Sequence, residues 1–404
     1  MARSPSYRPI LTGLSLLSLS ISLAGCPDDP SEGGDELGDS GSDGSGSDGP
    51  GTTSESSSSD SSSDSGSDSG TGDSDSSSDS GSGSESDSGT TAGTSDSTDT
   101  GSESDSSSGD TGMPFACEPV DPPVPPADCA DAGIIITPEF APFYECYDLG
   151  NLPNVPNNWG GLTVEIDDPY VLLIGGAANT ANGQLYAVEI TRDVGCHVTG
   201  WAGTPIMPFA EAAYNDGGVA YGPDDVLFLA RWPNNQLGQQ KLGSVATDKI
   251  IDLAPFAVVS SPGGLNFVPP GFGGEGLLKF VSWSGGQWYT VDIAPDGNGT
   301  FDILSATLET TIPGGPEGFV HIGADNPGFP VEGLLVSEWS AGNLAAYDAD
   351  ADGDPVLASR RDFVVGLTGA EGAFLDPYSG DFLFTTFGGG NRLIAIRGFL
   401  PNPQ

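Results

Sequence analysis

The chain has 404 residues, of which 57 are acidic and 11 basic, and its formal net charge is −46. Binding to nucleic acid needs clustered lysine and arginine that displace counterions from phosphates, so this charge balance excludes a nucleic-acid partner. The same balance excludes adhesion to an anionic lipid surface through basic patches. The composition favours a soluble, extracytoplasmic protein.

The N-terminus has the parts of an export signal. Arg3 and Arg8 precede a short apolar run that ends in the letters LAGC at residues 23–26. A charged start, a short apolar run and small residues before a cleavage point are typical of a secretory signal, and the run is too short to span a membrane. LAGC resembles the lipobox of bacterial lipoproteins. This resemblance implies that residues 1–25 are a signal peptide and that Cys26 carries the lipid; an ordinary signal peptide with a chance cysteine is the alternative.

Residues 26–112 consist almost wholly of Ser, Asp, Gly, Thr and Glu, without lysine or arginine. Low hydrophobicity combined with charge of one sign cannot offset the chain entropy lost on folding, so this segment is predicted to be a disordered tether. Repulsion between its carboxylates extends it, which suits a spacer that holds a folded domain away from the lipid. Calcium buffering and an O-glycosylated stalk are the alternatives.

From residue 113 the composition changes, and short apolar runs alternate with Gly, Pro, Asn and Asp clusters, which predicts an all-β domain. A doublet that ends in glycine opens five of these runs. The copies are GGLTVEI (160–166), GGVAYGP (217–223), GGLNFVP (263–269), EGFVHIG (317–323) and EGAFLDP (371–377). Each copy continues into a second and a third apolar strand, and most units show a fourth. Four strands in every fifty-odd residues predict a β-propeller blade.

The count predicts five four-stranded blades within residues 143–404. After the last third strand too few residues remain for a fourth, and YECYDLG (144–150) is expected to supply it and so close the ring. Six blades are the alternative, but the extra blade would have to come from the lead, residues 113–142, which is too rich in proline for ladder strands. The Gly- and Pro-rich repeats with PEG and PDG turns resemble the NHL and SMP-30/gluconolactonase-like propellers.

Four further cysteines predict two disulfides in an exported chain, with three connectivities allowed. They are Cys117, Cys129, Cys146 and Cys196. The pairing expected here is Cys117 with Cys129 inside the lead and Cys146 with Cys196. Zinc is the alternative, although no C-x-x-C spacing is present.

Propeller geometry predicts one rim that carries a binding site. The starts of first strands and the ends of second strands share a face of the disc, and aromatic side chains are expected around two carboxylates there. These residues are Trp232, Trp283, Trp339, Phe387, Glu317 and Glu371. Flat apolar surface with a few polar groups suits a small molecule or a sugar. Aromatic packing between blades and polar capping of strands are the alternatives.

The resemblance to SMP-30-like lactone hydrolases implies a metal-binding role for the glutamates, because a glutamate in an EGP-type motif helps to hold the axial metal in that family. PEGF and AEGA look similar and would make Glu317 and Glu371 ligands. The other three units carry glycine at the equivalent place, so the asparagine and aspartate partners of the family are not identifiable. Two carboxylates alone are a poor calcium cage.

The letters DADADGD at residues 348–354 predict a second acidic site. Asp348, Asp350, Asp352 and Asp354 resemble the opening of an oxygen-rich calcium loop. Ser359 stands where an EF-hand has its glutamate, so a short, weak calcium loop is expected, with a solvated turn as the alternative.

These observations favour a lipid-anchored, monomeric envelope protein whose propeller acts as a binding or interaction module for a glycan, a peptide or a small molecule. A metal-dependent hydrolase of lactones that uses Glu317 and Glu371, and a purely structural surface protein, are the alternatives. The membrane is contacted only through the lipid, at the outer membrane or cell surface, and calcium is the one cofactor expected.

Overall fold

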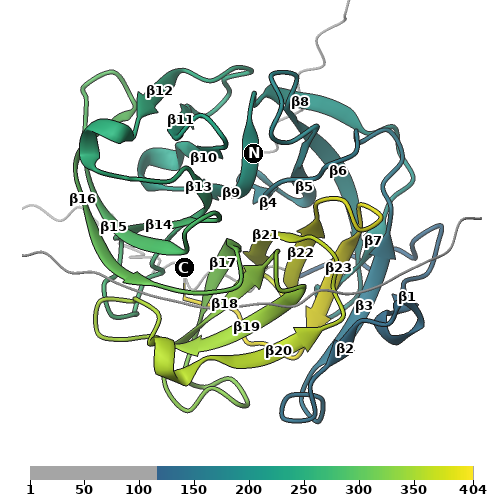
Figure 1. Cartoon of the computed structure of the whole chain (residues 1–404). Helices are drawn as coiled ribbons and strands as arrows, with labels where there is room; N and C mark the ends of the chain where they lie inside the picture. The colour runs from purple at the N-terminus through teal and green to yellow at the C-terminus, as the bar shows by residue number, and fades with distance from the viewer. Residues whose placement is uncertain (1–115, 404) are drawn as a thin grey trace, which may run out of the picture. The chain divides into compact units, whose positions relative to one another are not determined.

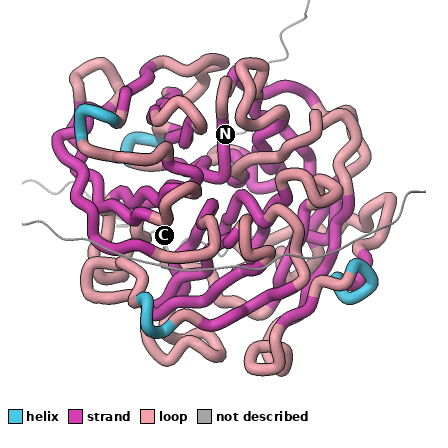
Figure 2. The backbone as a smooth tube through the Cα atoms, viewed as in Figure 1, coloured by secondary structure: helices cyan, strands magenta, loops and turns pink. Residues whose placement is uncertain are grey.

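The computed structural model describes residues 116–403 (Figure 1). The signal peptide, Cys26 and the tether therefore lie outside the described residues. Within the described range the structure is almost entirely strand and loop, with a few single turns of helix (Figure 2). None of these turns is long and apolar enough to cross a bilayer.

The strands form five antiparallel sheets arranged around a common centre, which confirms a five-bladed β-propeller (Figure 1). Blade 1 contains β4 (Leu162–Glu165), β5 (Asp168–Gly176) and β6 (Gln184–Arg192), with β7 (Val198–Trp201) and β8 (Met207–Glu211) both paired to β6, and blade 2 contains β9 (Asn215–Tyr221), β10 (Leu227–Arg231), β11 (Gln236–Gln240) and β12 (Lys249–Asp252). Blade 3 contains β13 (Pro262–Phe267), β14 (Leu278–Ser282), β15 (Gln287–Pro295) and β16 (Phe301–Thr311), and blade 4 contains β17 (Pro316–Ile322), β18 (Gly333–Glu338), β19 (Asn343–Asp348) and β20 (Arg361–Val365). Blade 5 contains β21 (Ala370–Leu375), β22 (Phe382–Thr386) and β23 (Leu393–Arg397).

The ring closes where the sequence predicts. Strand β3 (Glu145–Gly150) pairs with β23 and becomes the fourth strand of blade 5. The proline-rich lead makes no sixth blade; it adds β1 (Ala127–Asp128) to β3 and β2 (Ile135–Ile136) to β20. Proline has no N–H to donate to a ladder, so this segment contributes only two-residue edge strands.

The hydrophobic cores lie between neighbouring blades. Phe228 of blade 2 packs in one cluster with Phe280 of blade 3, and Leu335 of blade 4 packs in another with Phe384 of blade 5. A middle strand is covered on both faces, which is why all six residues of β18 are buried. Covered faces explain the continuous apolar runs of the second strands, since a strand with one wet face would alternate.

A layer of five glycines closes the centre of the ring. These glycines are the second residue of each repeated doublet: Gly161, Gly218, Gly264, Gly318 and Gly372. A Cβ on any of them would collide with the innermost strand of the next blade; at Gly318 it would lie 2.5 Å from the backbone nitrogen of Ala373. Real Cβ atoms do not approach backbone so closely, so the repeated glycine is the residue that lets the five strands meet.

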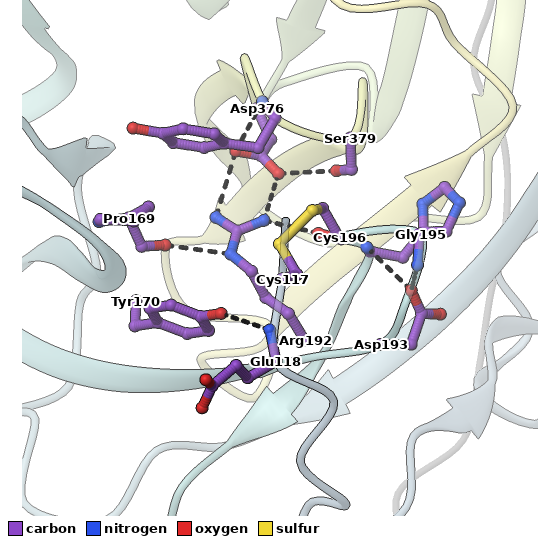
Figure 3. The surroundings of a disulfide bond; sticks show 12 residues. Cys117, Glu118, Pro169, Tyr170, Arg192, Asp193, Gly195, Cys196, Asp376 and Ser379 are labelled. Carbon is purple, nitrogen blue, oxygen red and sulfur yellow. Dashed lines mark hydrogen bonds and ion pairs between the residues drawn. A yellow bond between two sulfur atoms is a disulfide. The ribbon is translucent and has the colours of Figure 1, made fainter. Parts of the chain in front are cut away.

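Residues 116–403 contain two disulfides, and the expected pairing of the cysteines is wrong. Cys117 pairs with Cys196 and Cys129 pairs with Cys146. The reason is register: β1 pairs with β3 so that Asp128 lies opposite Tyr147, and the next pair along the ladder is Cys129 and Cys146. Cys117 is thereby left for Cys196, in the turn between β6 and β7 (Figure 3).

Candidate functional site

A small pocket at one end of the axis contains every aromatic and glutamate side chain that the sequence placed on this rim. Its volume is about 140 Å³, and we call it the axial pocket. The lining residues are Trp232, Trp283, Trp339, Phe387, Glu317 and Glu371, together with Asn179 and Asp216. The structure thus brings the predicted set together and adds an amide and a third carboxylate.

Backbone order explains how these residues converge. Glu317 and Glu371 lie at the starts of the innermost strands β17 and β21. The aromatic residues directly follow the ends of the second strands: Trp232 follows β10, Trp283 follows β14, Trp339 follows β18 and Phe387 follows β22. In an antiparallel blade the start of one strand and the end of the next share an edge, so each blade delivers both kinds of side chain to one rim.

Three tryptophans stand edge to face along this rim. The ring centroids of Trp232 and Trp283 are 6.0 Å apart at 88°, and those of Trp283 and Trp339 are 5.8 Å apart at 83°. Such T-shaped pairs are a preferred aromatic geometry and hold the rings in fixed positions. Gly315 and Gly369 make room for the indoles, because a Cβ there would lie 3.0 Å and 3.2 Å from the Nε1 atoms of Trp283 and Trp339.

Three carboxylates meet at the floor of the pocket. Asp216, Glu317 and Glu371 are 1%, 4% and 2% exposed, and one ligand oxygen from each lies within 4.8 Å of the others. Four of their buried oxygens have no hydrogen-bond donor: both of Asp216, Oε2 of Glu317 and Oε1 of Glu371. Buried carboxylates are normally paired, so this group of unsatisfied acceptors has the chemistry of a cation-binding site.

Burial and mutual repulsion shift the protonation of all three groups. Burial raises the pKa of Asp216 to about 7, while contacts with Glu371 and Asn179 oppose that rise. Burial, followed by repulsion from Asp216, raises the pKa of Glu317. The pKa of Glu371 is raised by burial and then by repulsion from both partners. A bound cation would reverse these shifts, because it favours the ionised form of each carboxyl.

The donor set fits a hard divalent cation. Carboxylate and amide oxygens are the ligands that calcium, magnesium and manganese prefer. Two ligand oxygens on opposite sides of a calcium ion lie about 4.6–5.2 Å apart, given metal–oxygen distances of about 2.3–2.6 Å, and the three carboxylates lie within that span. Asn179 adds an amide oxygen, buried and without a donor, at the same pocket.

Only two of the five doublets carry glutamate, and the structure shows why blades 2 and 3 do not. The first residues of their doublets, Gly217 and Gly263, lie beside the Glu317 carboxylate. A Cβ at Gly217 would lie 3.1 Å from Oε2 of Glu317, and one at Gly263 would overlap the same carboxylate. The absence of a side chain at these two glycines therefore leaves the space that the Glu317 carboxylate occupies.

Sequence reasoning missed Asp216 and Asn179. Asp216 directly precedes the glycine doublet of blade 2, one position before the place where blades 4 and 5 carry glutamate. Asn179 lies in the loop after β5, where the other four blades have an aromatic residue. Each of these two residues lies where the sequence departs from the repeat. Such departures, and not the repeated residues, would have indicated them.

The aspartates of the predicted calcium loop do not share a centre. Asp354 is buried and accepts hydrogen bonds from Nζ of Lys279 at 2.6 Å and Nε1 of Trp288 at 2.7 Å. Asp350 accepts from the backbone amides of Asp352 and Asp354, as in an ordinary turn. Among the described residues the axial carboxylates form the one group of acidic, histidine or cysteine side chains close enough to share an ion. Calcium at the loop stays a prediction.

Fold and pocket together define a five-bladed β-propeller with an acidic axial pocket. No family profile and no curated protein matches the sequence. Similar solved structures include a gluconolactonase from Xanthomonas campestris, with 12% identity, a TM-score of 0.40, and coverage of 72% of this chain and 100% of that one. An auxiliary nutrient binding protein from Bacteroides thetaiotaomicron shows 10% identity and a TM-score of 0.37 over 59% of this chain and 58% of that one. These likenesses concern the fold.

Proposed function

We propose that the propeller is a cation-dependent binding module. Asp216, Glu317 and Glu371, with Asn179, would hold a divalent cation at the floor of the axial pocket, and calcium is the ion that suits these ligands best. The supporting observation is the convergence of buried carboxylate oxygens without donors. Calcium takes six to eight oxygens, so the four side chains leave positions for water or for oxygens of a ligand.

The aromatic rim favours an oxygen-rich ligand with flat apolar faces, such as a sugar. The rings of Trp232, Trp283 and Trp339 offer stacking surface, and hydroxyl groups of a sugar could complete the coordination of the cation. Aromatic walls with few placed polar groups are the usual composition of small-molecule sites. The pocket itself is small, so it would take one end of such a ligand.

The cation is tested by thermal melting of the full chain in EDTA and in millimolar calcium. The expected result is a rise in melting temperature for the wild type, because an ion that binds only the folded state stabilises it. The matched variant, Asp216→Asn/Glu317→Gln/Glu371→Gln, keeps the tether and its carboxylates but should show no rise. An equal rise in both proteins would assign the ion to another part of the folded domain, such as the Asp348–Asp354 loop, and reject the axial site.

The ligand is tested on a glycan array in calcium. Trp283→Ala should lose capture by about tenfold or more, since a stacked aromatic contributes roughly 0.5–1.5 kcal/mol beyond its buried area. Trp201→Ala, on β7 and outside the pocket, is the control. If Trp283→Ala captures glycans as the wild type does and still shows the calcium-dependent melting shift, the cation site is retained and the proposal of a sugar ligand is rejected.

Hydrolysis of a lactone or a related ester is the second candidate, and one observation favours it. Three carboxylates carry one negative charge more than a divalent ion neutralises, so one could act as a general base while the ion polarises a carbonyl. A lactone panel decides between the two. Calcium-dependent turnover that is lost in Glu317→Gln/Glu371→Gln supports the hydrolase, and binding without turnover supports the module.

We also propose that the protein acts at the cell envelope as a lipid-anchored monomer. The support is the LAGC sequence and the acidic tether, both outside the described residues. Mass spectrometry of the mature N-terminus tests it: a diacylated or triacylated Cys26 is expected, whereas an unmodified Cys26 or cleavage elsewhere would reject the anchor.

A further inference from the structure

A second and larger pocket lies at the other end of the axis, beyond the glycine layer. Its volume is about 500 Å³, and we call it the apolar pocket. All five blades contribute to its wall, and so does the end of the described chain at Asn402 and Pro403. The innermost strands connect the two pockets: β9 has Asp216 in the axial pocket and Val219 in this one.

The wall is mainly apolar and aromatic. Tyr221, Phe267, Phe374 and Tyr378 line it, together with prolines at the strand ends. A concave space of this size lined by apolar and aromatic groups is typical of a small-molecule site, for which volumes of about 300–1,000 Å³ are usual. The axial pocket is too small for such a ligand and differs in chemistry, so the two pockets would take different molecules.

The charge of the apolar pocket has one sign. Glu165, at the end of β4, is the one acidic residue of the wall, and no lysine or arginine lines it. Glu165 is half-buried, and its Oε2 accepts a hydrogen bond from the backbone amide of Asp167, at 3.1 Å. Burial, followed by the charges of Asp167 and Asp168, raises its pKa. These neighbours reinforce a negative potential that no side chain of the wall neutralises.

The basic side chains in or near the wall of the apolar pocket do not neutralise this negative potential. The guanidinium of Arg192 lies 5.3 Å from the centroid of the Tyr378 ring but is already paired with Asp376. His321, also in the wall, is 1% exposed, and burial lowers its pKa to about 4, so it is neutral. Its Nδ1 is a buried acceptor without a donor. The apolar pocket therefore contains acceptors and aromatic faces but no cation.

We infer that the apolar pocket binds a small aromatic or alicyclic molecule that bears a cationic amine, with the amine beside Glu165. The apolar body of such a ligand removes the wall from water, which is the main driving force for a site of this kind. The ammonium group pairs with a half-buried carboxylate and can rest on the face of Tyr221, since aromatic faces attract cations. A single carboxylate is too few ligands for a metal ion.

The experiment compares three probes of equal size, namely benzylammonium, benzyl alcohol and benzoate. Each is titrated by calorimetry into the full chain at pH 7 and 0.15 M salt, with calcium present to occupy the axial pocket. Benzylammonium should bind at least about tenfold more tightly than benzyl alcohol, and benzoate should show no binding. Equal affinity for benzylammonium and benzyl alcohol would overturn the inference.

Variants locate the site. Glu165→Gln should reduce benzylammonium to the affinity of benzyl alcohol, whereas the control Glu189→Gln, at an exposed position of β6, should change nothing. The triple axial variant should bind benzylammonium as the wild type does, so a failed axial site does not hide the result. Loss in the axial variant and retention in Glu165→Gln would place the amine in the axial pocket and reject the proposal; unfolding of Glu165→Gln is checked by melting.

Discussion

The two faces of the propeller use buried acidic side chains in opposite ways. At the aromatic end, Asp216, Glu317 and Glu371 are buried without a basic partner. Towards the other end, buried aspartates each have one: Asp376 pairs with Arg192 at 2.5 Å and Asp354 with Lys279 at 2.6 Å. A buried acid with a basic partner joins blades, whereas the three axial acids have only one another and polar neighbours.

Figure 3 shows how complete the paired arrangement is. Arg192 of blade 1 donates to both oxygens of Asp376 in blade 5, and also to the backbone carbonyls of Pro169 and Cys196. Ser379 donates a further hydrogen bond to Asp376. Every charge is satisfied inside the protein, so no ligand is needed. The axial carboxylates have nothing equivalent.

The largest expected effect comes from breaking the paired arrangement. Arg192→Met should lower the free energy of unfolding by about 3–5 kcal/mol, because it leaves Asp376 buried and uncompensated. Urea denaturation measures the loss. Lys241→Met, which removes an exposed pair with Asp248, is the control and should cost no more than about 1 kcal/mol. Similar losses in the two variants would show that burial does not set the value of these pairs.

Neutralising the axial carboxylates should not destabilise the calcium-free protein, in contrast to the Arg192→Met change. In EDTA at pH 8, Asp216→Asn/Glu317→Gln/Glu371→Gln should unfold at the same or a higher urea concentration than the wild type, because it removes repulsion between buried acids. The wild type alone should gain stability from calcium, by about 2.7 kcal/mol at one hundred times the dissociation constant. Strong destabilisation of the variant in EDTA would mean that these carboxylates are structural.

Filling the space beside Glu317 should remove the cation without removing a ligand. Gly263→Ala places a Cβ where the Glu317 carboxylate lies, so calcium affinity should fall by about tenfold or more. Gly323→Ala is the control, since its nearest neighbour would be 3.7 Å away. Calorimetry of calcium binding compares the two. Equal affinities would show that Glu317 is not held in place by this glycine.

The smallest expected effect is on pH dependence. A carboxyl whose pKa is raised on folding opposes stability once the unfolded chain has lost its proton, so the calcium-free protein should become less stable as pH rises from about 4 through about 7. Calcium should reverse this trend, because it binds the ionised form. Urea midpoints at pH 5 and pH 8, with and without calcium, measure both. A calcium-free protein that gains stability over this interval would contradict the raised pKa values.

The repeat predicted the fold because one physical requirement recurs in every blade. Five glycines are needed where five strands meet, and four strands are needed to fill each sector, so the blade count and the closing strand β3 were accessible from spacing. The rim residues followed from strand order. Trp283, Trp339, Glu317 and Glu371 therefore lie together as expected.

The features that the sequence did not predict depend on strand register, on breaks in the repeat and on how distant segments meet. Asp216 enters the axial pocket one position before its counterparts, and no spacing rule indicates such a shift. The cysteine pairing failed because it depends on how two short lead strands align, which proline-rich sequence does not specify. The apolar pocket was not predicted because its wall is assembled from all five blades and the chain end.

Anomalous diffraction from a crystal of the protein soaked in manganese or calcium tests the central claim most directly. A peak is expected between Asp216, Glu317 and Glu371, at about 2.0–2.6 Å from an oxygen of each. The absence of a peak there at millimolar ion, or a peak only at the Asp348–Asp354 loop, would contradict the account.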